Sequence, residues 1–163
     1  MNIQITGIPR SLEELKAMPQ SAMRTPEDTA ALTIAALCTY PDDPNACYQM
    51  LDYLRGPRPL SPLEKQFIRD RFIDGKGYIP RSFFLGATPE NDYTPSEPLT
   101  VVVSDSTAQT AEEGYHILLV RSGGADSPRS ITLRLKPSTG QWFLWDQMLL
   151  AGIREPVSQD PWA

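Results

Sequence analysis

A β-hairpin predicted over residues 130–145 constrains the fold of this chain more than any other stretch. Residues 130–136 (SITLRLK) alternate apolar and polar side chains, the period-two pattern of a strand with one buried face. Residues 137–140 (PSTG) predict a turn, because proline fixes φ at the first corner and glycine accepts a positive φ before the chain returns. The return strand, residues 141–145, carries two of the three tryptophans. The hairpin therefore indicates where the core lies.

The turn also sets a register for this hairpin. The predicted cross-strand pairs are Lys136 with Gln141, Leu135 with Trp142, and Leu133 with Leu144. One apolar face results, and we expect Trp142 to be buried in it. The opposite face carries Phe143 and Trp145. These aromatic residues lie beside Arg134 and Thr132, so we expect that face to be covered as well.

Four segments within residues 1–75 carry helix start signals. A Ser, Thr or Asp stands at each predicted N-cap, and proline follows it at the first helical position in three of the four. The predicted helices are residues 12–18, 27–40, 44–55 and 62–73. The second of these is rich in Ala and Leu and is expected to be the most buried.

The stretch from Gly77 to Pro98 is irregular. Its four prolines exclude a regular helix or a central strand, yet its aromatic residues are too numerous for a free linker. We call residues 76–98 the strap. We expect it to be ordered without a ligand, against the sheet edge or the helix layer.

Residues 99–103 and 115–121 predict two further strands, so the sheet is expected to have about four. The fold class is α+β, with an N-terminal helical array packed on a C-terminal antiparallel sheet. The tail ends in a polar segment with Trp162, which we expect to dock into a groove. A single domain is expected to span residues 1–163, made of a helical part (1–75), the strap (76–98), antiparallel strands (99–152) and a tail (153–163).

Composition and charge exclude several function classes. A length of 163 residues is enough to bury a core without a metal or disulfides. The net charge of −5 argues against a nucleic-acid partner, which requires a basic surface. No apolar run approaches the ~18 residues of a membrane span, and the first residues do not resemble a secretory signal. We therefore expect a cytoplasmic protein with no membrane partner, in which Cys38 and Cys47 are reduced thiols.

No catalytic set is recognisable. His116 is the only histidine, so neither a triad nor a multi-histidine metal site is indicated. We expect it to be a core or surface-facing histidine. Acidic residues adjacent in sequence point apart on a helix or strand and are no evidence for a carboxylate pair. The sequence predicts no catalytic residues, no metal and no cofactor.

The loop RSGGADSPR (residues 121–129) is the one candidate ligand site. Arg121 and Arg129 flank Gly123 and Gly124, whose amides are sterically free to converge on an anion. The alternative is a structural clasp between strands, in which Asp126 caps backbone amides. We favour the clasp, because the spacing and context of a phosphate-binding loop are lacking.

Three stretches together resemble a family of bacterial proteins, mostly from Gram-positive anaerobes, described as a domain of unknown function. They are GYIPRSFFLGATPENDYTPSEPLTV (77–101), VRSGGADSPRSITLRLKPSTGQWFLWD (120–146) and GIREPVSQDPWA (152–163). The resemblance implies bacterial origin and one compact domain. It carries no activity, so it assigns no functional residue.

These observations favour a non-catalytic cytoplasmic module that binds a protein partner or itself. The alternative is a small-molecule binding protein or enzyme with a site between the strap and the sheet, where Arg81, Arg121 or Arg129 would hold an anionic ligand. Residues 82–120 carry six acidic residues and no Lys or Arg. This acidic stretch could face the basic segment 55–81 within the fold or between copies.

Overall fold

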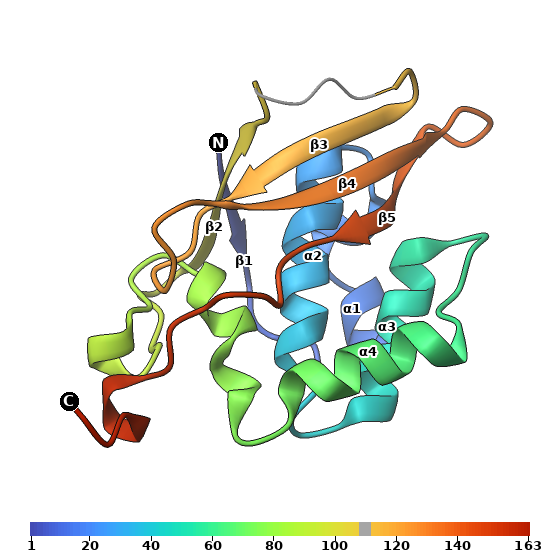
Figure 1. Cartoon of the computed structure of the whole chain (residues 1–163). Coiled ribbons are helices and arrows are strands. Elements are labelled where there is room, and N and C mark those ends of the chain that lie inside the picture. The colour runs from blue at the N-terminus through green and yellow to red at the C-terminus, as the bar shows by residue number, and fades with distance from the viewer. Residues whose placement is uncertain (108–111) are drawn as a thin grey trace.

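The computed structural model describes residues 1–107 and 112–163, which form helices on one side of a curved antiparallel sheet (Figure 1). The α-helices of these residues are α1 (Leu12–Lys16), α2 (Pro26–Cys38), α3 (Pro44–Arg55) and α4 (Pro62–Phe72). The strands are β1 (Asn2–Ile5), β2 (Leu99–Asp105), β3 (Tyr115–Val120), β4 (Arg129–Lys136) and β5 (Gln141–Gln147). The sheet order is β1-β2-β3-β4-β5.

The predicted α+β class is confirmed, with the helices N-terminal and most of the sheet C-terminal. The number of strands was wrong, because the sheet has five strands rather than about four. The additional strand, β1, pairs antiparallel with β2 from within the part predicted to be helical. Its four residues are too few for a period-two pattern to stand out. Their burial alternates only because the distant β2 provides a partner.

The predicted helix ends differ from the observed ones by at most two residues. Thr25, Asp43 and Ser61 cap α2, α3 and α4 as expected, each accepting a hydrogen bond from a backbone amide in the first turn. Ser61 and Glu64 form a reciprocal capping box. No helix that the structure describes is both long and apolar enough to cross a membrane.

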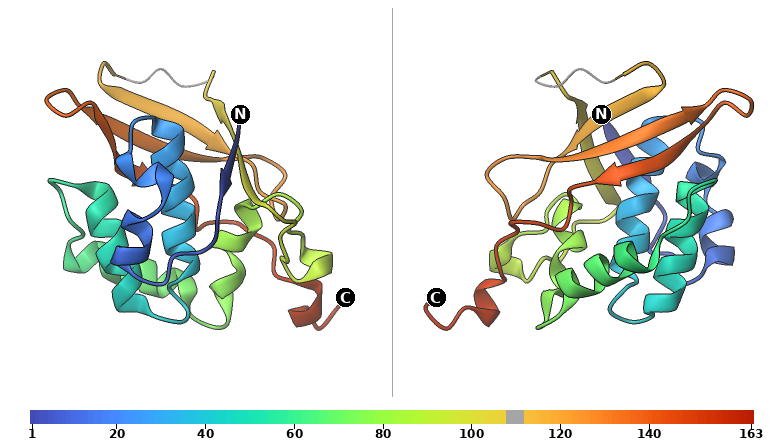
Figure 2. Two further views of the ribbon diagram at one scale, coloured as in Figure 1. Left: turned by 180° about the vertical axis from the view of Figure 1, so that it is seen from behind. Right: turned by 45° about the vertical axis from the view of Figure 1, so that its right-hand side comes forward.

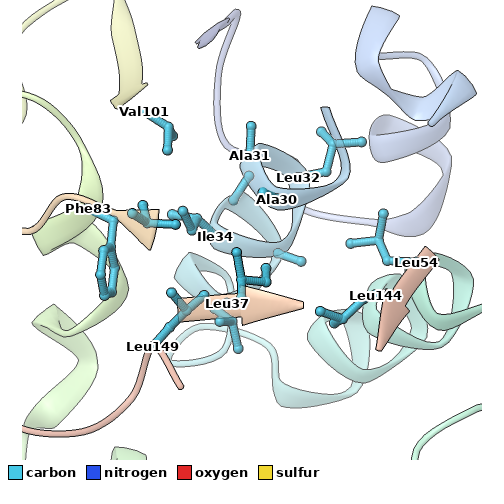
Figure 3. Close-up of a cluster of buried hydrophobic side chains, with 14 of the residues drawn as sticks. Ala30, Ala31, Leu32, Ile34, Leu37, Leu54, Phe83, Val101, Leu144 and Leu149 are labelled. Atoms are coloured by element: carbon cyan, nitrogen blue, oxygen red, sulfur yellow. The ribbon is translucent and has the colours of Figure 1, made fainter. Parts of the chain in front are cut away.

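Helix α2 forms the centre of the core. Its residues 29–37 are all buried, so this helix exposes no face along more than two turns. The sheet curves over it, and the other helices pack around its lower half (Figures 1 and 2). Its alanines allow neighbouring elements to approach closely. Figure 3 shows Leu32, Ile34 and Leu37 extending from α2 among side chains of the strap, the sheet and α3.

The β4–β5 hairpin has the register that the turn predicts. Lys136 pairs with Gln141, Leu135 with Trp142, and Leu133 with Leu144. Beyond Leu133 a β-bulge shifts the pairing, so Thr132 pairs with Asp146. The predicted place of Trp145 beside Thr132 was therefore wrong. The bulge leaves Trp145 outside the regular ladder, with its ring on the outer face.

The strap packs against the body through three short 3-10 turns, η2 (Lys76–Tyr78), η3 (Pro80–Phe83) and η4 (Pro89–Asn91). Tyr78 and Tyr93 are buried and stack with ring centroids 5.3 Å apart. Phe83 and Phe84 are buried in the main core, and Phe84 forms a bridge with Val101 of β2. These apolar contacts account for the order of a segment that has no regular secondary structure.

The docking predicted for the tail tryptophan was wrong. Trp162 is 93% exposed, although Ile153 and Pro156 of the same tail are buried. A turn in which the Trp162 amide donates to the Asp160 carboxylate, at 2.8 Å, holds the backbone while the ring points to solvent.

Trp142 offers a test of the hairpin register. Its ring is partly buried against the core, its amide donates to the carbonyl of Met23, and its carbonyl accepts from Thr29. We expect Trp142→Ala to lower the free energy of unfolding by about 3 kcal/mol, the lower end of the range for core aromatics. Urea denaturation measures this loss. Trp162→Ala is the matched control and should leave the midpoint unchanged, so equal midpoints for both variants would contradict the register.

Candidate functional site

The guanidinium of Arg129 donates three hydrogen bonds to the backbone. It donates to the carbonyls of Ala151 at 2.8 Å, Ser127 at 2.8 Å and Gly152 at 2.9 Å. These bonds tie the start of β4 to the segment that follows β5. Arg129 therefore holds the ends of the hairpin together.

The two glycines of this loop lie against the strap and the tail. The Gly123 amide donates to the Ser82 carbonyl at 2.9 Å, and the Gly124 amide donates to the Ser122 hydroxyl at 3.1 Å. A Cβ at Gly123 would lie 1.9 Å from the carbonyl oxygen of Ala87. Glycine is required here for close backbone approach, and both amides already have acceptors.

Arg121 differs from the other predicted ligand residues. Its side chain is exposed, beside shallow hollows between β2, the strap and the loop. Asp126 forms its ion pair with Arg154 at 3.1 Å and not with either loop arginine. The structure thus brings Gly123, Gly124 and Arg129 into contact with the body and leaves Arg121 facing solvent. Anion binding by this loop stays a prediction.

A wide cleft of about 750 Å³ separates the strap from the C-terminal end of α2. Arg10 and Arg81 line it, but so do Asp42, Asp43 and Glu97. The guanidinium of Arg81 donates to the carbonyls of Tyr93 and Asp92, both at 3.3 Å. The cleft therefore has no excess of positive charge.

Cys38 also lines this cleft, and its chemistry is set by its surroundings. Burial raises the pKa of the Cys38 thiol to about 12, although the charge of Arg81 opposes the shift. Burial also raises the pKa of Cys47, and the nearby Cys38 adds to that shift. Both cysteines are free thiols in the structure. At neutral pH they are protonated and unreactive.

A second cavity, of about 360 Å³, lies between the α3–α4 connection and the outer face of the β4–β5 hairpin. We call it the basic-aromatic groove. Four of its lining residues are basic, the other six are apolar, and none is acidic. The lining residues are Arg55, Pro57, Arg58, Arg134, Leu135, Lys136, Pro137, Phe143, Leu144 and Trp145.

Guanidinium groups and aromatic rings alternate along this groove. The Cζ of Arg58 lies 3.9 Å from the ring centroid of Trp145, and the Cζ of Arg134 lies 4.7 Å from the same ring. Arg134 also lies 5.2 Å from the ring of Tyr115, which meets Trp145 edge-on. Such cation–π contacts hold the guanidinium groups in fixed orientations.

Two local features build the groove. At the end of α3, Gly56 has φ 62° and lies directly against the ring of Phe143, where a Cβ would come within 2.5 Å. This close approach lets the α3–α4 connection cross the edge strand β5 and place Arg58 over Trp145. The bulge in β5 leaves Trp145 unpaired, and alternation along the strand keeps its ring on the outer face beneath Arg58.

Among the residues that the structure describes, one groove cation has an acidic partner. Arg55 forms an ion pair with Glu64 at 2.7 Å. Burial alone would raise the pKa of Glu64, but hydrogen bonds with Ser61 and the charge of Arg55 together lower it. Arg58 donates one bond to the Trp145 carbonyl. In the part of the chain that the structure describes, Arg134 and Lys136 form no ion pair.

The groove was not predicted from the sequence. The hairpin pattern places Arg134 and Lys136 on the same outer face as Phe143, which was a usable signal. Arg58, however, comes from a connection 87 residues before Trp145, and no local pattern predicts that approach.

Comparison with protein families gives one match. A model described as a domain of unknown function (DUF6935) matches residues 7–157. The chain belongs to this family. The DUF6935 match covers every residue of the basic-aromatic groove and of the loop 121–129, and it confirms the resemblance to a family of unknown function. Comparisons with curated proteins and with solved structures gave no match.

The close approach at Gly123 can be tested by adding one methyl group. We expect Gly123→Ala to destabilise the protein by about 2 kcal/mol, because the strap must move away from the loop. Gly7→Ala is the control, since nothing lies within 4 Å of its Cβ position. Thermal or urea unfolding measures both, and a stable Gly123→Ala variant would show that the contact is dispensable.

The raised pKa of Cys38 predicts slow thiol chemistry. At pH 8 the native protein should react with an aromatic disulfide reagent on the order of a hundredfold more slowly than the urea-unfolded chain, whose cysteines have ordinary pKa values. Cys47→Ser isolates the signal of Cys38. Equal native and unfolded rates would show that the thiol is accessible and ionised.

Proposed function

We propose that this domain is a non-catalytic protein-interaction module and that it binds an acidic segment of a partner protein in the basic-aromatic groove. The observation that carries the proposal is the lining of the groove, which has four basic residues and no acidic one in a chain of net charge −5. Positive charge concentrated against the overall charge of a protein favours an acidic partner and steers its approach.

The groove suits a peptide better than a lone anion. Its lining includes the apolar residues Leu135, Phe143 and Leu144, while the basic residues Arg58, Arg134 and Lys136 are exposed. An acidic segment with interspersed apolar side chains would match both parts. The stacked guanidinium groups lose little freedom on binding, and each can donate two hydrogen bonds to a carboxylate.

The remaining parts of the proposal rest on the sequence and the thiol chemistry. Raised pKa values of Cys38 and Cys47 support the non-catalytic interpretation, because they disfavour a cysteine nucleophile. The negative net charge supports a protein over a nucleic acid. The resemblance described above supports a bacterial origin, in Gram-positive anaerobes. Cytoplasmic localisation accords with the two cysteines being free thiols.

The alternative is a small anionic ligand bound between the strap and the body. The observation that favours it is the 750 Å³ cleft with Arg10 and Arg81. Against it, Arg81 already donates to two backbone carbonyls, and Asp42, Asp43 and Glu97 line the same cleft. An anion would meet more negative than positive charge there.

The groove can be tested with a fluorescein-labelled peptide that alternates Glu and Tyr. We expect fluorescence anisotropy to report binding that weakens as salt is added. Arg58→Ala and Arg134→Ala should each reduce affinity about tenfold, the loss expected for one charge-assisted contact. The wild-type protein and a double variant that combines Arg58→Ala with Arg134→Ala should then be used to capture partners from a host lysate. Proteins that bind the groove should be captured by the wild type and lost with the double variant.

The control is Arg121→Ala, which also removes one exposed arginine but lies outside the groove. It should bind the peptide as tightly as the wild type. If Arg121→Ala loses binding and Arg134→Ala retains it, the ligand binds at the loop 121–129 and the groove proposal fails. If sedimentation shows that the chain forms a dimer, the partner bound in the groove is a second copy of this chain and not another protein.

A further inference from the structure

Three metal-binding side chains meet at one rim of the concave sheet face. They are Glu27 in the first turn of α2, Asp105 at the end of β2 and His116 in β3. One ligand atom from each residue lies within 4.8 Å of the other two. We propose that these residues bind a divalent transition-metal ion such as Zn²⁺, a site independent of the proposed partner binding.

The strand register explains why these side chains converge. Asp105 pairs with the buried Leu118, so both point to the inner face of the sheet. His116 precedes Leu118 by two residues and shares that face. It therefore lies diagonally opposite Asp105, within reach of its side chain. Near the N-terminus of α2, the inner face of β2 and β3 carries polar side chains in place of the apolar ones of the core. Glu27 lies in the first turn of α2, beside these side chains.

The imidazole is held by its surroundings. Its Nε2 lies 2.7 Å from the Asp105 Oδ1, and its ring meets Trp142 edge-on with centroids 5.9 Å apart. Trp142 is itself fixed by the hydrogen bonds of β5. The ring orientation is therefore set by packing from an element outside the cluster, which favours a defined metal ligand.

The charge balance of the cluster also points to a cation. Glu27 and Asp105 lie close together, and among the described residues neither forms an ion pair with Lys or Arg. The N-terminus of α2 compensates only part of this charge. A divalent ion would supply two positive charges and bind all three side chains.

The donor set selects the class of ion. An imidazole nitrogen favours Zn²⁺ and its neighbours over Mg²⁺ and Ca²⁺, which prefer oxygen ligands alone. With metal–ligand distances of about 2.1 Å, ligands of one tetrahedral zinc ion lie about 3.4 Å apart. Asp105, with a side chain 72% exposed, is free to make that adjustment. Three protein ligands leave a fourth position open to water or to an anionic group.

The single histidine makes the test direct. In a long-range ¹H–¹⁵N spectrum of the chelator-treated protein, every imidazole signal belongs to His116. Zn²⁺ in slight excess should shift these signals and raise the melting temperature, whereas Mg²⁺ should do neither. Zinc bound only at Cys38 or Cys47 would leave the imidazole signals in place. That result, or no response to zinc, would overturn the proposal.

Ligand variants complete the experiment. Glu27→Gln and Asp105→Asn should each weaken zinc binding at least tenfold. Loss of a residue that only hydrogen-bonds to a metal ligand already has an effect of that size. His116→Gln should abolish the zinc-dependent rise in melting temperature. Glu90→Gln is the matched control, because its exposed carboxylate lies outside the cluster. Wild-type affinity in either carboxylate variant would remove that residue from the site and refute the three-ligand arrangement.

Discussion

The burial of α2 is the constraint on which the rest of the structure depends. Residues 29–37 have no exposed side, so every direction around the helix must be covered by another element. The sheet curves over it, α3 packs beside it, and Phe83 of the strap closes the remaining side (Figure 3). The strap is therefore part of the core. Since the concave face of the sheet is filled by α2, polar groups that can bind a ligand lie on its rim or on its outer face.

The β4–β5 hairpin divides these roles between its two faces. Leu133 and Leu144 form the inner face and belong to the core, whereas Arg134 lies on the outer face. Alternation along β5 places Trp145 on the outer face as well, where the bulge after Leu133 leaves it without a paired residue in β4. Arg58 covers its ring from the α3–α4 connection. The crossing of this connection thus converts part of the outer sheet surface into a groove with a basic and apolar lining.

What could be predicted from the sequence was local. The hairpin register followed from a period-two pattern and one turn, and the helix starts followed from capping residues. What could not be predicted depends on distant segments. Strand β1 is defined by its pairing with β2, and the groove by the approach of Arg58 to Trp145. The loop 121–129 shows the same limit, because its glycine amides look free in the sequence until the strap supplies the Ser82 carbonyl.

The two proposed sites share one strand. Tyr115 contacts Arg134 and Trp145 on the outer face of β3, and the next residue, His116, points to the inner rim. Alternation along a strand separates their side chains, so neither ligand would touch the other. Any influence of one site on the other must therefore pass through the position or mobility of β3. Thermodynamic linkage then requires reciprocity: if an ion at His116 strengthens binding in the groove by some factor, an acidic segment in the groove must strengthen ion binding by the same factor.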